Sequence, residues 1–162
     1  MGAMIRHMLA ITSVLLSTPA VFAASLDDYV GEWRGTGTFE RQGSQERTGR
    51  LHCRLTIARH GETAIVVRGR CAAPEGSRGF QIRIVETPDG ALGAENVAPA
   101  NARPKTSVGT LDGGGIRLRG DDGAFSTHFL LSDPASGEMR MQSGASGGGN
   151  SESADVGLKR VN

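Results

Sequence analysis

The stretch from Leu51 to Cys71 constrains the fold of this chain more than any other. Two runs of alternating apolar and polar residues flank a short polar connection that contains Gly61, a pattern typical of a β-hairpin. A turn centred near Glu62 places Cys53 directly opposite Cys71 and gathers the aliphatic side chains on one face. A shift of one residue would bury four arginines, so burial sets the register. We therefore predict a disulfide between Cys53 and Cys71 that closes the hairpin.

The same register predicts further contacts between strands. The stretch that follows the hairpin, residues 79–86, alternates in the same way and is expected to pair with the second hairpin strand. The predicted facing pairs are Leu55–Gly69 and Ile57–Val67 within the hairpin, and Phe80–Cys71 and Ile84–Val67 with the next strand. Gly35 and Gly37 occupy inward positions of an earlier strand, which predicts that this strand bends or is crossed closely by another backbone.

Alternation of this kind recurs from residues 29–42 to residues 156–159, and no window after residue 23 has the period of an amphipathic helix. We count about nine strands with short Gly- and Pro-containing turns. Residues 87–104 are expected to be irregular, with at most one short strand near residues 91–97. The Gly/Ser-rich residues 143–151 are expected to precede the last strand. We predict an all-β fold, an antiparallel up-and-down meander forming a closed or half-open barrel, with a β-sandwich as the alternative.

The first residues have the features of a secretory signal peptide: a basic start at Arg6, a short apolar run, and small residues before Ala23. The apolar run is too short for a good membrane span, which needs about 20 apolar residues. We predict a signal peptide over residues 1–23 and a single β-barrel-like domain over residues 24–162. Export to the periplasm, or secretion, agrees with a disulfide, because such bonds persist in oxidising compartments.

Charge and motifs narrow the function. Without Arg6 the formal net charge falls from +1 to zero, which gives no general argument for binding nucleic acid. A G-x-S-x-G match at residues 144–148 lacks the following helix and a later His that a nucleophile elbow requires. The residue types of a zinc site are present, but without ligand spacing, in His52, Cys53, His60 and Cys71. We predict no enzyme, no metal and no cofactor.

The outer face of the hairpin and the next strand carries a cluster of arginines. These residues, called here the basic patch, are Arg50, Arg54, Arg68, Arg70 and Arg83. One interpretation is a solvated face whose charges pair with Glu62, Glu75 or Glu86. The other is a surface that binds an acidic partner of the cell envelope, such as lipopolysaccharide phosphates, or a protein.

The inward residues allow two interpretations, a filled core or the wall of an apolar pocket. A small barrel interior is either just filled by side chains or holds one small ligand. Gly35, Gly37 and Gly69 leave room inside, and methionines suit an adaptable apolar ligand. The candidate pocket residues are Trp33, Phe39, Phe80, Phe125, Phe129, Met139 and Met141.

At residues 30–39, VGEWRGTGTF, the chain resembles the G-x-W opening of calycin-like barrels, the lipocalins and their bacterial relatives. It also resembles uncharacterised small secreted proteins of alphaproteobacteria over most of the mature chain. The residues that carry this second likeness are Gly31 to Gly37, Glu46-Arg47, Cys53-Arg54, Arg70-Cys71-Ala72 and Leu158 to Arg160. The resemblances imply one exported β-domain.

We therefore expect a non-enzymatic periplasmic barrel that binds a small apolar ligand or serves the cell envelope through its surface. The alternative is a secreted protein-binding module such as a protease inhibitor, since some small bacterial barrels with one disulfide have that role. In that case a flexible, exposed segment at residues 24–28 would enter the protease cleft.

Overall fold

The structure is a computed structural model that describes residues 25–134 and 136–161. The predicted signal peptide lies outside these residues. One 3₁₀ helix, η1 (Leu26–Tyr29), precedes ten strands. The strands are β1 (Gly31–Gln42), β2 (Arg47–Arg59), β3 (Ala64–Ala73), β4 (Gly76–Glu86), β5 (Ala91–Ala98), β6 (Thr106–Asp112), β7 (Gly115–Asp121), β8 (Phe125–Leu131), β9 (Glu138–Gly147) and β10 (Asn150–Arg160).

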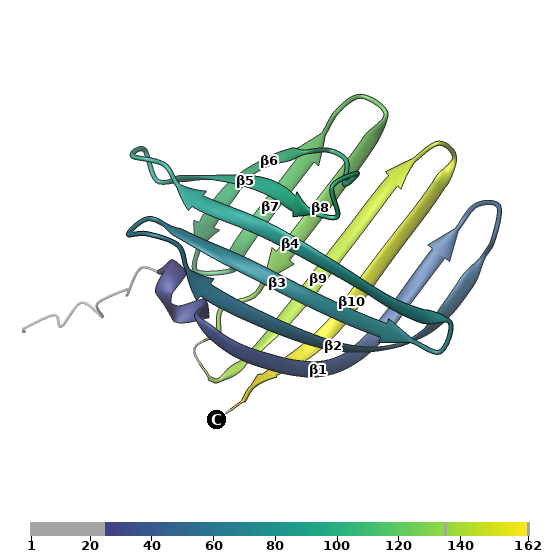
Figure 1. Ribbon diagram of the computed structural model, residues 1–162, viewed down its shortest axis with the longest axis horizontal. Coiled ribbons are helices and arrows are strands. Elements are labelled where there is room, and N and C mark those ends of the chain that lie inside the picture. Colours follow the sequence, from purple (N-terminus) through teal and green to yellow (C-terminus); the bar gives the residue numbers. More distant parts are fainter. Residues whose placement is uncertain (1–24, 135, 162) are drawn as a thin grey trace, which may run out of the picture.

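Each strand pairs antiparallel with its neighbour in the chain, and β1 pairs with β10 to close the barrel. In Figure 1, η1 lies at the end of the barrel where β1 begins, and the β1–β2 and β9–β10 turns project at the opposite end. We call these the η1 end and the open end. The predicted all-β meander is confirmed as a closed barrel, so the sandwich alternative does not apply.

The short strand expected near residues 91–97 is present as β5 (Ala91–Ala98), and it brings the number of strands to ten. The Gly/Ser-rich residues 143–151 form the end of β9, a tight turn and the start of β10. The prediction missed this hairpin because its inward residues are small, so they produce no apolar alternation.

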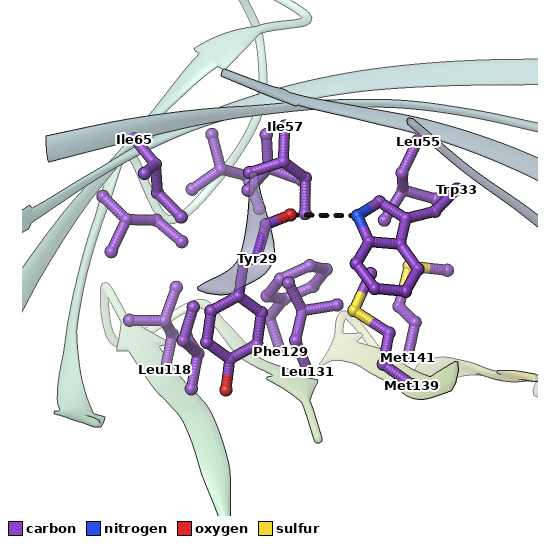
Figure 2. Close-up of a cluster of buried hydrophobic side chains, with 14 of the residues drawn as sticks. Tyr29, Trp33, Leu55, Ile57, Ile65, Leu118, Phe129, Leu131, Met139 and Met141 are labelled. Carbon is purple, nitrogen blue, oxygen red and sulfur yellow. Dashed lines mark hydrogen bonds between the residues drawn. The ribbon is translucent and has the colours of Figure 1, made fainter. Parts of the chain in front are cut away.

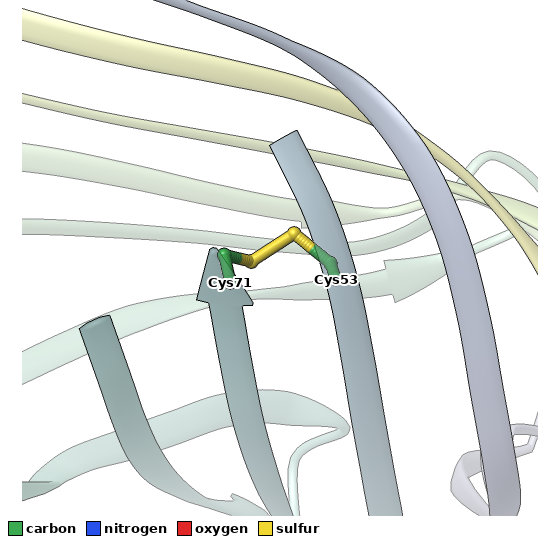
Figure 3. Close-up of a disulfide and its surroundings, with 2 residues drawn as sticks. All are labelled: Cys53 and Cys71. Carbon is green, nitrogen blue, oxygen red and sulfur yellow. A yellow bond between two sulfur atoms is a disulfide. The ribbon is translucent and has the colours of Figure 1, made fainter. Parts of the chain in front are cut away.

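The predicted hairpin register is confirmed. Cys53 pairs with Cys71 and is joined to it by a disulfide between neighbouring strands, with 4.1 Å between the two Cα atoms (Figure 3). Leu55 faces Gly69, as expected from the burial argument. This pairing links the two central strands of the β1–β4 side of the barrel.

The predicted register between β3 and β4 is wrong by two residues. Phe80 faces Gly69, not Cys71, and Ile84 faces Ile65, not Val67. The turn is tighter than expected, because Ala73 already pairs with Gly76. A shift of two residues leaves every side chain on its predicted face, so the inward and outward sets are unchanged.

Gly35 and Gly37 let β1 approach β10 very closely. A Cβ atom at either position would overlap the backbone of β10, at Gly157 and Asp155 respectively. The prediction of a close backbone crossing at these two glycines is therefore confirmed. The space beside them is filled by backbone, so they do not enlarge the interior.

The interior of the η1 end is filled with large apolar side chains (Figure 2). Trp33 and Tyr29 are fully buried, and the Trp33 indole donates a hydrogen bond of 2.9 Å to the Tyr29 carbonyl. Arg160 covers the same end: its guanidinium lies 4.4 Å from the Trp33 ring centroid and donates hydrogen bonds of 2.6 Å to the carbonyls of Asp28 and Val30. Residues of η1, β1 and β10 thus close this end of the barrel together.

Of the segment predicted to be flexible and exposed, the structure describes residues 25–28. Ser25, Asp27 and Asp28 are exposed as expected, but these residues form a capped turn that is anchored in the barrel. Ser25 caps η1 in a capping box with Asp28, Leu26 is buried, and Asp27 forms an ion pair with Arg59. Since η1 is anchored in the barrel, it is not free to enter a protease cleft. A single 3₁₀ turn is also too short to give a helical period in the sequence.

Candidate functional site

The open end holds a cavity of about 790 Å³ that reaches solvent. Its inner wall is apolar and includes Leu118 from β7, Phe129 from β8 and Met141 from β9. Asn96, Ser107 and the rim residues below add polar groups. Ligand pockets in proteins typically measure about 300–1,000 Å³ and have mainly apolar walls with few polar groups. The cavity has the size and chemistry of a site for one small ligand.

The cavity exists because the inward residues near the open end are small. Along β9, Met139 is buried in the filled end and Met141 is buried in the inner wall of the cavity. The next inward residues along the strand are Ser143 and Ala145. Along β10, Val156 is buried, whereas Ala154 lines the cavity. Small side chains at these alternate positions leave the barrel unfilled on this side.

Two phenylalanines of the cavity wall lie over glycines on the neighbouring strand. Phe39 pairs with Gly49 and Phe80 pairs with Gly69. In both cases a Cβ atom on the glycine would collide with the phenylalanine ring. Each ring therefore lies along the wall and covers the exposed glycine backbone, an arrangement that stabilises strands. Because the rings lie on the wall, they do not fill the cavity.

Three charged side chains meet at the rim of the cavity. Glu152 on β10 accepts contacts at one carboxylate oxygen, Oε2, from Arg41 of β1 at 3.4 Å and from Arg78 of β4 at 3.1 Å. Arg41 is the register partner of Glu152 on the adjacent strand. β4 is separated from β10 by three strands on one side and five on the other, so the Arg78 contact crosses the opening.

The seven predicted pocket residues divide between the two ends. Phe39, Phe80, Phe129 and Met141 line the cavity, and the Phe80 and Phe129 rings meet edge to face with centroids 5.9 Å apart. Trp33 and Met139 are buried in the filled η1 end. Phe125 is 38% exposed and packs under Arg103, away from the cavity wall. Arg41, Arg78 and Glu152 also line the cavity and were not among the residues predicted from the sequence.

All five residues of the basic patch lie on the outer face. Arg54 faces Arg70 on β3 and also Arg34 on β1, a residue absent from the predicted patch. Arg83 is paired with Glu95 at 2.6 Å, instead of with the acidic residues expected, and Arg68 donates a hydrogen bond to Gln81 at 3.3 Å. Binding by this surface stays a prediction.

The Tyr29 hydroxyl is a polar group buried among the apolar side chains of the η1 end. It is buried without a hydrogen-bond partner among the described residues. Burial, together with the negative charge of Asp133, raises its pKa to about 12. It lies in the filled core and is not part of the cavity wall.

Within the residues described, no three His, Cys, Asp or Glu side chains are grouped so as to hold a metal ion. That same part of the chain contains no helix with the length and apolar character needed to cross a membrane.

No family model and no curated protein matches this chain. Among solved structures it is similar to the S-type phycobiliprotein lyase CPES from Guillardia theta, with a TM-score of 0.61 and 12% sequence identity. The match covers 85% of this chain and 90% of that one. At this identity the likeness shows the fold alone, which is the antiparallel barrel expected from the sequence.

The comparison also corrects one prediction. We expected a protein that is not an enzyme, but the barrel is similar to that of a protein named as a lyase. A missing catalytic motif in the sequence therefore does not argue against catalysis on this fold. The prediction that the protein is not an enzyme is withdrawn. The chain is a closed ten-stranded antiparallel barrel whose fold is similar to that of this lyase.

Proposed function

We propose that this protein binds one small, mainly apolar ligand in the cavity at the open end of its barrel. The observation that carries the proposal is the cavity of about 790 Å³ inside a barrel whose other end is filled. A barrel that needed its interior only for stability would gain by filling this end as well, because burial of apolar surface contributes about 25 cal/mol per Å². With small inward residues at this end, the barrel lacks that stabilising free energy.

Binding of N-phenylnaphthylamine, a neutral apolar dye whose fluorescence rises in apolar surroundings, tests this proposal. The variant Ala154→Trp places a large ring in the cavity, since Ala154 is one of its wall residues. The matched control is Ala72→Trp, at an exposed position on the outer face of β3. We expect saturable binding at one site, lost in Ala154→Trp and kept in Ala72→Trp.

Two results would contradict the proposal. If the parent protein does not bind the dye at all, the cavity is not an apolar ligand site. If both tryptophan variants bind it as the parent does, the dye occupies another surface. Thermal unfolding of both variants shows whether a loss of binding comes from a loss of folding.

The compartment we assign to this function is the periplasm or the cell exterior. Support comes from the Cys53–Cys71 disulfide, because such bonds persist where the environment is oxidising. The predicted signal peptide points the same way. Cell fractionation with an intact mass measurement tests the assignment: the expected product begins at Ala24, and a full-length cytoplasmic product would contradict it.

The basic patch supports a second candidate function, binding to an anionic membrane surface. Arg34, Arg54 and Arg70 stand directly opposite one another on three adjacent strands. Like charges in this position repel each other, and within the described residues neither Arg34 nor Arg54 forms an ion pair. A row of this kind suits phosphate groups on an extended surface.

Sedimentation with vesicles that contain anionic phospholipid tests this surface. We expect binding at low salt that is lost at high salt, because exposed charges are screened. The double variant Arg54→Gln, Arg70→Gln should abolish it. The control Arg117→Gln removes an outer arginine that is paired with Asp112 at 2.7 Å, and it should bind as the parent does. Absence of binding at low salt would end this hypothesis.

A further inference from the structure

The three charged side chains at the rim of the cavity, Arg41, Arg78 and Glu152, indicate that the ligand also carries a charged group. Glu152 is held by two arginines from different strands, and both contact the same oxygen atom. Its side chain is 47% exposed and that of Arg78 is 73% exposed. Exposed ion pairs contribute little to stability, about 0–1 kcal/mol. The group is therefore poorly explained as a structural brace.

Glu152 occupies the position between two arginines that the carboxylate of a bound ligand could take. It lies on the inward side of β10, two residues before the cavity-lining Ala154, and belongs to the cavity wall itself together with Arg41 and Arg78. Guanidinium groups recognise carboxylates through directed, charge-assisted hydrogen bonds. A ligand carboxylate at the rim would meet these same donors, and Glu152 can turn toward solvent.

We infer that the cavity binds an amphipathic monocarboxylate, whose carboxylate lies between Arg41 and Arg78 and whose apolar body lies along the inner wall. This inference rests on the proposed function and adds the chemical class of the ligand. From Glu152 to the buried Val156 the strand covers about 13 Å at 3.3 Å per residue. A carboxylate at the rim thus leaves room for an apolar body that extends to the filled core.

The rim pairing also places Glu152 in competition with the ligand. The Arg78–Glu152 contact crosses the opening between β4 and β10. A ligand carboxylate that takes the place of Glu152 must break this contact, so Glu152 lowers the affinity for anionic ligands. A neutral ligand does not compete with Glu152 for the arginines, so the contact between Arg78 and Glu152 can stay in place once the ligand has entered.

Dansyl-undecanoic acid and its methyl ester form a pair of probes that differ only in the charge of the head group. At low salt we expect the parent protein to bind the acid about tenfold more tightly than the ester, a difference of about 1.4 kcal/mol. The variant Arg41→Gln, Arg78→Gln should lose this preference and bind the acid no more tightly than the ester, because the negative charge of Glu152 is then left unpaired at the rim. The variant Glu152→Gln should bind the acid several-fold more tightly, with the ester unchanged.

The control is Arg50→Gln, which removes an exposed arginine of β2 near the same end. Arg50 faces Thr38 on the outer face and does not line the cavity, so its removal should leave the preference for the acid intact. High salt should reduce the preference in the parent protein, because the arginines are exposed.

The outcomes separate this inference from the function on which it rests. Equal binding of acid and ester by the parent protein would overturn the inference and leave the apolar cavity site in place. A preference for the acid that persists without Arg41 and Arg78 would also overturn it. Failure to bind either probe would overturn the proposed function, and the inference with it.

Discussion

The two ends of the barrel are made from the same ten strands but have opposite interiors. At the η1 end, Trp33, Leu55 and Ile65 are fully buried, and η1 and Arg160 cover the opening. At the open end the inward positions carry small residues, Phe39 and Phe80 lie along the wall, and charged side chains surround a cavity. Stability and binding are therefore assigned to different ends of one closed sheet.

The largest expected effect comes from Trp33. Trp33→Ala removes a fully buried ring from the filled end and should lower the free energy of unfolding by about 3–5 kcal/mol. Phe39→Ala, at the open end, should cost less than half as much, because the Phe39 ring is only partly buried. Urea unfolding of the two variants measures the difference. Equal losses would show that the open end contributes to stability as the η1 end does.

The disulfide joins the strands where the filled and open regions meet, since Cys53 is buried with the core and Cys71 lines the cavity. Replacing both cysteines by alanine should lower the free energy of unfolding by about 3 kcal/mol, as expected for a loop of this size. Dye binding to the folded variant should survive, because the barrel is held by its hydrogen-bonded strands. A folded variant that no longer binds would mean that the disulfide shapes the cavity.

Tyr29 should make the filled end sensitive to alkaline pH. Its pKa is raised in the folded protein from 10.0 to about 12, so the folded state holds its proton more tightly than the unfolded state does. This contribution is complete below pH 10 and is lost as the pH rises toward 12, by about 3 kcal/mol in all.

Unfolding titrations between pH 8 and pH 12 measure this loss, with Tyr29→Phe as the control. The variant should lack the steep part of the pH dependence. At pH 7 it should be as stable as the parent or more so, because it removes a buried hydroxyl that has no partner among the described residues. An identical pH profile in the variant would assign the alkaline sensitivity to other groups.

Gly69→Ala is expected to have the smallest effect on the free energy of unfolding and to act mainly on ligand binding. In Gly69→Ala the new methyl group collides with the Phe80 ring, which must move into the cavity. Dye affinity should fall about tenfold, that is by about 1.4 kcal/mol, with a modest loss of stability from overpacking. Gly93→Ala is the matched control, because a Cβ atom at Gly93 meets no atom within 4 Å.

A second substitution sharpens this test. Combining Gly69→Ala with Phe80→Ala removes the displaced ring and should restore room for the dye. If Gly69→Ala binds as the parent does, the position of the Phe80 ring does not control the cavity. The open end would then owe its volume only to the small residues of β8, β9 and β10.

The residues that could be predicted are those whose environment follows from local alternation. The pairing of Cys53 with Cys71 is an example: a one-residue shift would have buried arginines, and the observed register is the expected one. The β3–β4 register was missed because a shift of two residues preserves every face, so burial does not distinguish the alternatives. Only the tight turn from Ala73 to Gly76 decides between them.

The rim of the cavity could not be predicted for a different reason. Arg78 and Glu152 are 74 residues apart in the chain, and nothing in the alternation of either strand indicates that they meet. Their contact depends on the closure of β1 onto β10 and on the curvature that brings β4 across the opening. Phe39 and Phe80 were recognised as inward residues, but their orientation over glycines depends on the strand beside each of them.

By itself, the sequence determined the all-β architecture, the facing of almost every strand residue and the partner of each cysteine, because a period of two and the cost of burying charge act locally. The tertiary structure alone decided which inward residues became core and which became cavity wall. That division depends on how the closed sheet is filled along its axis. A glycine, serine or alanine in a strand has the same local preference whether a neighbouring side chain, a backbone or a ligand occupies the space beside it.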